Sequence, residues 1–213
     1  MEILLNNEVM LKGTVVSEIE YSHEIYSETF NKFVLRVPRL SENYDEVIIT
    51  ASERLTDTLN IGVGENIRIE GQFRSYNNYT DTGNKLVLTV FAKSIEQCED
   101  INDEPNSIYL NGYICKEPVY RTTPFGREIC DVLIAVNRQY GKSDYIPCIT
   151  WGRNAKFTGG LEVGTNMKIW GRIQSRNYKK RVTEEEYIEK TAYEVSVTKM
   201  EIVHKETAEM QSV

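Results

Sequence analysis

The sequence predicts an all-β protein in which one five-stranded domain occurs twice, and three observations support this. The segment "MKIWGRIQSRNYKKR" (167–181) repeats the spacing of "IRIEGQFRSYNNYTD" (67–81), sharing a glycine and a serine. Ile, Val, Tyr and Thr dominate the apolar runs, and turns containing Gly or Pro separate them. A length of 213 residues is sufficient for two domains of about 100 residues each.

The repeat extends along most of the chain. "VMLKGTVV" (9–16) matches "IYLNGYIC" (108–115), and "VLRVPR" (34–39) matches "LIAVNR" (133–138), both at an offset of 99. "VIIT" (47–50) matches "PCIT" (147–150), and "IGVGENIRI" (61–69) matches "LEVGTNMKI" (161–169), both at an offset of 100. Two copies are too few for a solenoid, so the pattern indicates a duplicated globular domain.

The elements follow one order in both copies. In the second copy we expect strands near 106–116, 127–137, 143–151, 165–178 and 190–203. A short helix is expected around "GRNAKFTGGL", where the first copy has "DTLNIG". Five strands with a helix after the third is the order of the OB-fold, a Greek-key barrel. We therefore predict an OB-fold at 1–97, a linker at 98–105, an OB-fold at 106–204 and a short tail at 205–213.

Composition argues against several functional classes. The chain has no apolar run near the roughly 18 residues of a membrane span and no visible secretory signal, so the cytoplasm, in association with the nucleoid, is the expected location. The four cysteines form no C-x-x-C pair, and they are interpreted as small buried hydrophobic residues. With two isolated histidines, no catalytic constellation is visible. We therefore expect neither an enzyme nor a metal or other cofactor.

Strand alternation separates what the copies share from what they do not. In the fourth strand, Met167, Ile169, Gly171 and Ile173 form the inward set, which the first copy keeps as Ile67, Ile69, Gly71 and Phe73. The outward set is rewritten: it is Lys168, Trp170, Arg172, Gln174, Arg176 and Tyr178 in the second copy and Arg68, Glu70, Gln72, Arg74, Tyr76 and Asn78 in the first. Residues 1–105 carry 9 Lys+Arg against 19 Asp+Glu, whereas 106–204 carry 15 against 11. Such a face suits single-stranded nucleic acid, although charge alone fits a solvated basic surface equally well.

Specific motifs in the second copy add to this interpretation. "LIAVNRQYGKSDYIPCITWGRNA" followed by "LEVGTNMKIWGRIQSRNYKKR" resembles the bacterial single-stranded DNA-binding protein family. The family-like features are the A-V-N-R run, the strand leading into W-G-R-x-A and the G-R-I-Q-S-R-x-Y strand. The resemblance covers about 106–203, and it implies an OB barrel around which single-stranded DNA wraps.

The resemblance implies a set of stacking residues and a set of phosphate contacts. The stacking positions are Tyr140, Tyr145, Trp151 and Tyr178, and their aligned residues in the first copy, none of them aromatic, are Ser41, Glu46, Ala51 and Asn78. Trp170 either stacks on a base or packs against a neighbouring barrel. Phosphate contacts are expected from the basic residues of the second copy, namely Arg121, Arg127, Arg138, Lys142, Arg153, Arg172, Arg176, Lys179, Lys180 and Arg181.

The predicted function is non-sequence-specific binding and protection of single-stranded DNA during replication, recombination or repair. Members of the family usually have one such domain and assemble as tetramers, so a homodimer presenting four barrels is expected, with replication or repair proteins as possible further partners. The first copy would serve assembly or contact another protein. The alternative is a protein-interaction or primosome-type accessory module with little DNA binding of its own.

Overall fold

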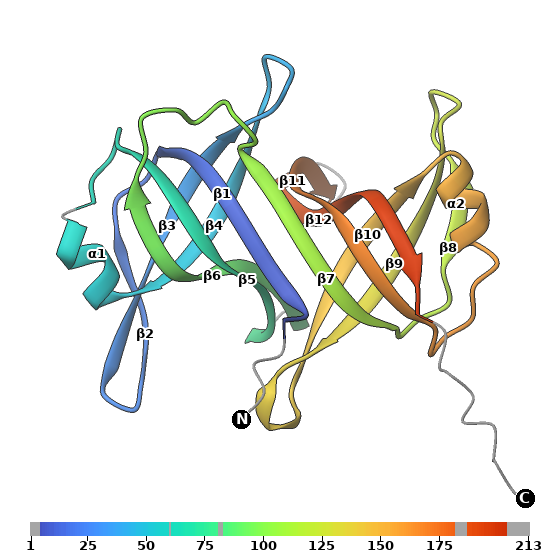
Figure 1. Cartoon of the computed structure of the whole chain (residues 1–213), viewed down its shortest axis with the longest axis horizontal. Coiled ribbons are helices and arrows are strands. Elements are labelled where there is room, and N and C mark those ends of the chain that lie inside the picture. Colours follow the sequence, from blue (N-terminus) through green and yellow to red (C-terminus); the bar gives the residue numbers. More distant parts are fainter. Residues whose placement is uncertain (1–4, 60, 81–82, 182–186, 204–213) are drawn as a thin grey trace, which may run out of the picture.

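The computed structural model describes residues 5–59, 61–80, 83–181 and 187–203, and it confirms two tandem all-β barrels (Figure 1). The first copy contains β1 (Asn7–Val15), β2 (Glu20–Ile25), β3 (Glu28–Pro38), β4 (Tyr44–Ser52), α1 (Glu53–Leu59), β5 (Asn66–Thr80) and β6 (Gly83–Gln97). The second contains β7 (Asn106–Ile114), β8 (Val119–Thr122), β9 (Glu128–Asn137), the 3-10 turn η1 (Gln139–Gly141), β10 (Ser143–Trp151), α2 (Arg153–Thr158), β11 (Asn166–Arg181) and β12 (Tyr187–Ile202).

Each copy has one strand more than the sequence predicted. The additional strands β2 and β8 form hairpins with β3 and β9, which are the second strands of the two barrels. Neither β2 nor β8 buries a side chain fully, so neither shows the apolar alternation that marks a strand in sequence.

Both barrels close in the same way. The parallel pairs β4–β6 and β10–β12 and the antiparallel pairs β1–β3 and β7–β9 complete the two rings. The inward residues of every main strand form the apolar core, including Leu11, Leu35, Ile49, Ile69 and Phe73 in the first copy and Leu110, Ile134, Ile146, Ile169 and Ile173 in the second.

The glycine shared by the two fourth strands is required by close backbone contact. A Cβ on Gly71 would overlap the carbonyl oxygen of Phe91, and one on Gly171 would overlap that of Ser196. A register shift lies at each of these glycines. The strand therefore bends there against its neighbour, and only glycine fits.

A local two-fold relation joins the two copies. Strands β1 and β7 pair antiparallel with Val9 opposite Ile108, its own counterpart, which makes one continuous sheet across both barrels. Because equivalent residues lie opposite each other, the copies contact each other as two identical subunits would. Within each copy the same internal bonds recur: the side chain of Asn7 exchanges two hydrogen bonds with the backbone of Phe73 (2.8 and 2.9 Å), and Asn106 does the same with Ile173 (2.7 and 2.9 Å).

The third strands align differently from the sequence match. Strands β4 and β10 share the burial pattern of their last six residues at an offset of 99, and Ile49 pairs with Val90 as Cys148 pairs with Val195. The counterpart of Trp151 is therefore Ser52, and the earlier assignment of Ala51 was wrong. A slip of one residue exchanges the two faces of a strand, and buried Ala51 corresponds to buried Thr150.

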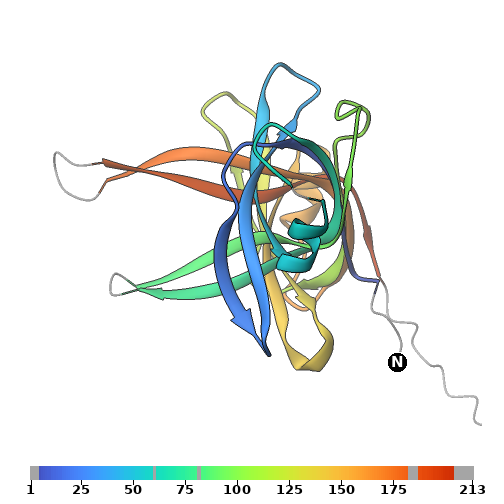
Figure 2. The same cartoon turned by 90° about the vertical axis from the view of Figure 1, so that its left-hand side faces the viewer.

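Two long hairpins, β5–β6 and β11–β12, project from the barrels to the same side (Figure 2). Gly71 pairs with Ala92 and Gly171 with Val197, so the second hairpin encloses five more residues than the first. None of the described helices is long and apolar enough to cross a membrane.

Candidate nucleic-acid interface

Strand β10 presents the first two aromatic side chains of the predicted site. Asp144, Ile146, Cys148 and Thr150 point inward and are buried, so the odd-numbered residues between them face outward. Tyr145 is 45% exposed. Trp151 is half-buried, and its indole Nε1 donates a hydrogen bond of 3.1 Å to the Ser196 hydroxyl of β12. This bond fixes the ring against the next strand.

Strand β11 supplies the third aromatic side chain. Tyr178 is 39% exposed, with the Arg176 guanidinium 5.9 Å from its ring centroid. Cross-strand pairs connect β10 to β11 through β12, because Ile149 lies opposite Ser196, and Ser196 lies opposite Arg172. We call this continuous outer surface the strand face, and it comprises Tyr145, Trp151, Arg172, Gln174, Arg176, Tyr178, Glu194 and Ser196.

Four of the ten predicted cations have their charges available. Within the described part of the chain, no ion pair involves the exposed residues Arg127, Lys142, Arg153 or Arg176. Arg121 pairs with Asp131 at 2.6 Å, with both side chains largely in solvent. An exposed pair of this kind contributes little, so a phosphate can replace its carboxylate.

Two predicted phosphate contacts have a structural partner instead. The Arg138 guanidinium binds the buried carboxylate of Asp144 and donates to the Ser75 carbonyl oxygen of the first copy at 2.9 Å. Arg172 reaches Asp45 of the first copy at 3.3 Å. Because Arg138 is held on two sides, the geometry favours a role in joining the copies over a phosphate contact.

These contacts belong to a network that occurs twice. Asp45 accepts hydrogen bonds from Arg39 and from the Ser175 amide (2.6 Å), while Asp144 accepts from Arg138 and from the Ser75 amide (2.5 Å). The bond to Asp45 raises the pKa of Arg39. Each carboxylate therefore ties the third strand of one copy to the long hairpin of the other.

The hydroxyl groups of the same two serines add a second tie. Ser75 Oγ accepts a bond from the Tyr145 amide (2.7 Å), and Ser175 Oγ accepts one from the Glu46 amide (3.0 Å). The first copy thus fixes the backbone of a predicted stacking residue.

In the first copy, the surface equivalent to the strand face is filled by its own side chains. His23 stacks on Phe30 at 5.0 Å, Phe30 contacts Phe91 at 5.4 Å, and the Arg74 guanidinium lies 3.9 Å from the Phe91 ring centroid. Phe91 occupies the position of Ser196. Burial lowers the pKa of Arg74, which is held inside this stack. At the position equivalent to Trp151 the first copy has Ser52, so no aromatic ring faces outward there.

Trp170 lies in a different group from the other aromatic residues. Its ring is 5.2 Å from that of Tyr109 on β7, and the Lys199 ammonium is 4.4 Å from the Trp170 centroid. Trp170 and Tyr109 are cross-strand partners on the outer surface of the sheet that joins the barrels. The side chains of Tyr140, Lys179, Lys180 and Arg181 lie outside the part of the structure that is described.

The sequence did not indicate two features of the strand face. Ser196, which orients Trp151, could be found only from the β10–β12 pairing. Glu194 places a carboxylate beside Gln174, whose amide donates to it at 2.5 Å, so the face is not uniformly basic.

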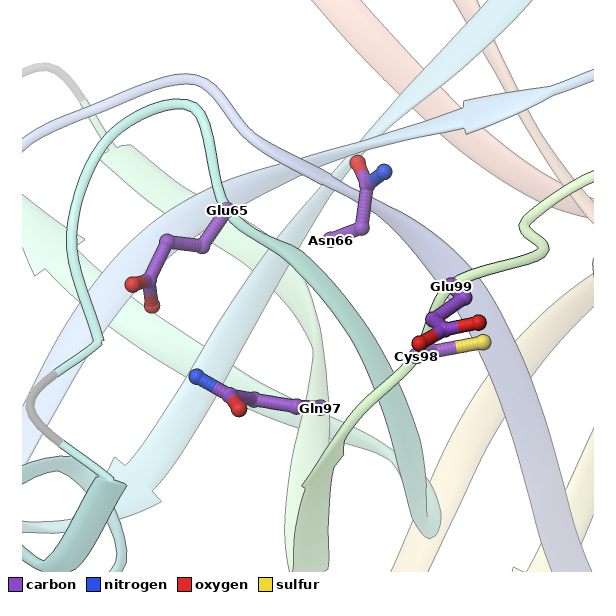
Figure 3. A pocket seen from close by; sticks show the side chains of 5 residues that line it. All are labelled: Glu65, Asn66, Gln97, Cys98 and Glu99. Atoms are coloured by element: carbon purple, nitrogen blue, oxygen red, sulfur yellow. The ribbon is translucent and has the colours of Figure 1, made fainter.

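A shallow pocket lies apart from this face, at the end of the first copy. Glu65, Asn66, Gln97, Cys98 and Glu99 line it (Figure 3). Two carboxylates without an aromatic ring or a cation do not suit a nucleic acid.

The cysteines and the acidic residues form no recognisable metal site. All four cysteines are free thiols, and burial raises the pKa of Cys148. Among the described residues, no three His, Cys, Asp or Glu side chains are grouped to hold a metal ion.

The fold and the strand face define a class, namely tandem OB-fold proteins with a basic and aromatic outer surface on one barrel. Comparison with known proteins is more specific: residues 105–203 match the model of the single-strand binding protein family. This part resembles single-stranded DNA-binding protein 1 of Staphylococcus aureus (36% identical) and single-stranded DNA-binding protein A of Bacillus subtilis (35%), each over 80 residues. These matches cover 34% of this chain, which spans about half the length of the curated relatives, 48% and 46% respectively.

A solved structure matches the whole two-barrel arrangement. The wild-type single-stranded DNA binding protein from Thermus aquaticus superposes with a TM-score of 0.73, covering 96% of both chains. At 18% sequence identity, this similarity shows the fold alone.

Proposed function

We propose that this chain binds single-stranded DNA without sequence preference, using the strand face of its second copy, during DNA replication, recombination or repair. The observation that carries this proposal is the joining of Tyr145, Trp151 and Tyr178 on one outer surface of three neighbouring strands, together with four nearby cations that have no ion pair within the described part of the chain. The names of the curated relatives support it.

Two kinds of contact would hold the strand. Bases stack on the three rings at about 1–3 kcal/mol each, which any base can do because every base has a π-face. Phosphates would contact Arg127, Lys142, Arg153 and Arg176, with Arg121 released from Asp131. Tyr140, Lys179, Lys180 and Arg181 remain part of the proposed site. No catalytic step is needed, and such a role would place the protein on the nucleoid in the cytoplasm.

The first copy (1–97) has a supporting role in this proposal. Its stack of His23, Phe30, Phe91 and Arg74 covers the surface around the position equivalent to Ser196, and its acidic charge repels phosphate. Through Ser75 it holds the start of β10, so its function is architectural. The linker (98–105), the second domain (106–204) and the tail (205–213) complete the proposed organisation.

We also propose that two chains assemble as a homodimer with four barrels. The continuous sheet carries Trp170, Tyr109 and Met10 on its outer surface, partly exposed and bordered by charged residues. An aromatic group of this kind suits the centre of a two-fold interface. Trp170 is therefore assigned to assembly, in preference to the stacking role predicted from sequence.

Fluorescence titration with a single-stranded oligonucleotide at several salt concentrations tests the main proposal. Both tryptophans, Trp151 and Trp170, lie in the second copy, and stacking should quench Trp151. With four or five cations on phosphates, log K should fall with log salt at a slope of about −3 to −4, at roughly −0.7 per contact. A flat salt response, or equal affinity for duplex DNA, would contradict the proposal.

A further inference from the structure

Helix α2 exposes an aromatic side chain that the strand face does not include. The helix buries Ala155 and Thr158 and turns Arg153, Lys156 and Phe157 toward solvent. Phe157 is 53% exposed. Residues four apart are neighbours on a helix surface, so Arg153 and Phe157 share one side.

The equivalent helix of the first copy keeps an arginine, Arg54, in place of Arg153, but it shows that the barrel does not require Lys156 or Phe157. Buried Thr56 of α1 corresponds to buried Ala155 at the same offset of 99 that relates β4 to β10. Asp57 and Thr58 therefore stand where the second copy has Lys156 and Phe157. The charge is reversed and an aromatic ring is added on a surface that the core leaves free. On the helix, as on the strand face, the second copy is therefore more basic and more aromatic than the first.

Helix α2 follows the last strand-face residue of β10 closely in the chain. Trp151 ends β10, and only Gly152 separates it from Arg153, while the Gly152 amide bonds to the Glu128 carbonyl oxygen of β9 at 2.9 Å. Strand β8 lies beside α2 (Figure 1), and a Cβ on Gly159 would be 3.1 Å from the Tyr120 Cβ. We call Tyr120, Arg153, Lys156 and Phe157 the helix patch.

The cations of the helix patch are accessible. Glu128 accepts bonds from the Lys156 ammonium (2.9 Å) and from the Tyr120 hydroxyl (2.7 Å). The Lys156 side chain is largely in solvent, so this pair contributes little and can exchange its carboxylate for a phosphate. Arg153 has no ion pair among the described residues.

We propose that the helix patch extends the path of single-stranded DNA beyond Trp151, with Phe157 stacking on a base and Arg153 and Lys156 binding phosphates. This inference rests on the proposed function of the strand face. Single-stranded DNA is the occupant that fits, because cations alternate with rings here and the patch continues directly from Trp151. A short oligonucleotide fills the strand face alone, and only a longer one reaches α2.

Tryptophan substitution in the whole 213-residue chain tests this directly. Phe157→Trp keeps an aromatic ring and adds a reporter, and Thr58→Trp places the same reporter on the equivalent site of the first copy. We expect an oligonucleotide of about 20 nucleotides to quench the new tryptophan of F157W, and one of about 8 nucleotides to leave it unchanged. T58W should gain no additional quenching with either length. Absence of additional quenching in F157W with the longer oligonucleotide would overturn the proposal, and would leave the patch to another occupant such as a protein.

A second pair of variants separates this inference from the function on which it rests. The double variant K156D/F157T takes the residues of the first copy. It should weaken binding of the longer oligonucleotide by about 5- to 50-fold and leave the shorter one unaffected. Trp151→Ala should weaken both lengths. If K156D/F157T binds the longer oligonucleotide normally, the helix patch is not part of the path. If Trp151→Ala binds both normally, the strand face itself is wrong.

Discussion

Replacing Trp151 by alanine tests the strand face at its most structured aromatic residue. The substitution removes one stacking ring, and a ring contributes about 1–3 kcal/mol per base, so affinity should fall by about 5- to 150-fold. It also removes the hydrogen bond from the indole to Ser196. That bond and part of the packing should lower the free energy of unfolding by about 1–2 kcal/mol. The barrel should remain folded, because Trp151 is not a core residue.

The anisotropy of a labelled oligonucleotide measures the affinity without relying on tryptophan fluorescence. Trp151→Phe keeps a ring and loses only the N–H donor, so it should recover most of the affinity. Ser52→Ala is the matched control at the equivalent position of the first copy, where the serine hydroxyl is buried without a partner. It should leave DNA binding unchanged.

Two results would refute this reasoning. If folded Trp151→Ala binds as tightly as the unsubstituted protein, the ring does not stack on DNA. If Trp151→Phe is as weak as Trp151→Ala, the hydrogen bond to Ser196 matters and stacking does not.

Three further predictions concern the contacts between the copies and between chains. Asp144→Asn should lower the free energy of unfolding, measured in urea, by about 2–3 kcal/mol. Asp45→Asn should lower it by more, because Asp45 faces two arginines. A larger loss for Asp144→Asn than for Asp45→Asn would contradict the network. Burial, with a smaller effect of the Glu46 carboxylate, raises the pKa of Tyr193 to about 12. The unfolded chain loses the Tyr193 proton near pH 10, so the free energy of unfolding should fall between about pH 10 and 12. Tyr193→Phe should make this fall smaller. The same pH profile in the variant and the unsubstituted protein would count against a raised pKa of Tyr193. Trp170→Glu, which takes the residue of the first copy at Glu70, should lower the mass in light scattering from about twice 24.6 kDa to 24.6 kDa; an unsubstituted monomer would exclude the dimer.

The duplicated barrel could be predicted from sequence because its signals are local. Alternation along β11 identified Met167, Ile169 and Ile173 as inward residues, and all three are buried. The same alternation placed Tyr145 and Trp151 on one side of β10. Strands β2 and β8 gave no such signal, because they are short, exposed hairpin arms stabilised by pairing with β3 and β9.

The alignment of Trp151 shows where sequence matching fails. The letters shared by "VIIT" and "PCIT" favoured an offset of 100, whereas inward packing selects an offset of 99. The residues of β4 and β10 that face the core are determined by the pairing of these strands with β6 and β12, and not by matching residue types in the sequence. The first copy still has no aromatic ring at the position equivalent to Trp151, because the residue there is Ser52 and not Ala51.

The repeat, the inward pattern and the residue types of the outer surface can be predicted from the sequence alone, because they depend on side-chain period and composition. Which of these residues act together depends on how the strands pack. Arg138 and Arg176 are alike in sequence, yet Arg138 is held by Asp144 of its own copy and by Ser75 of the other, whereas Arg176 lies beside Tyr178 and has no ion pair among the described residues. The physical reason is that a charge is committed or available according to the groups that folding brings near it, and these groups come from strands far apart in the chain.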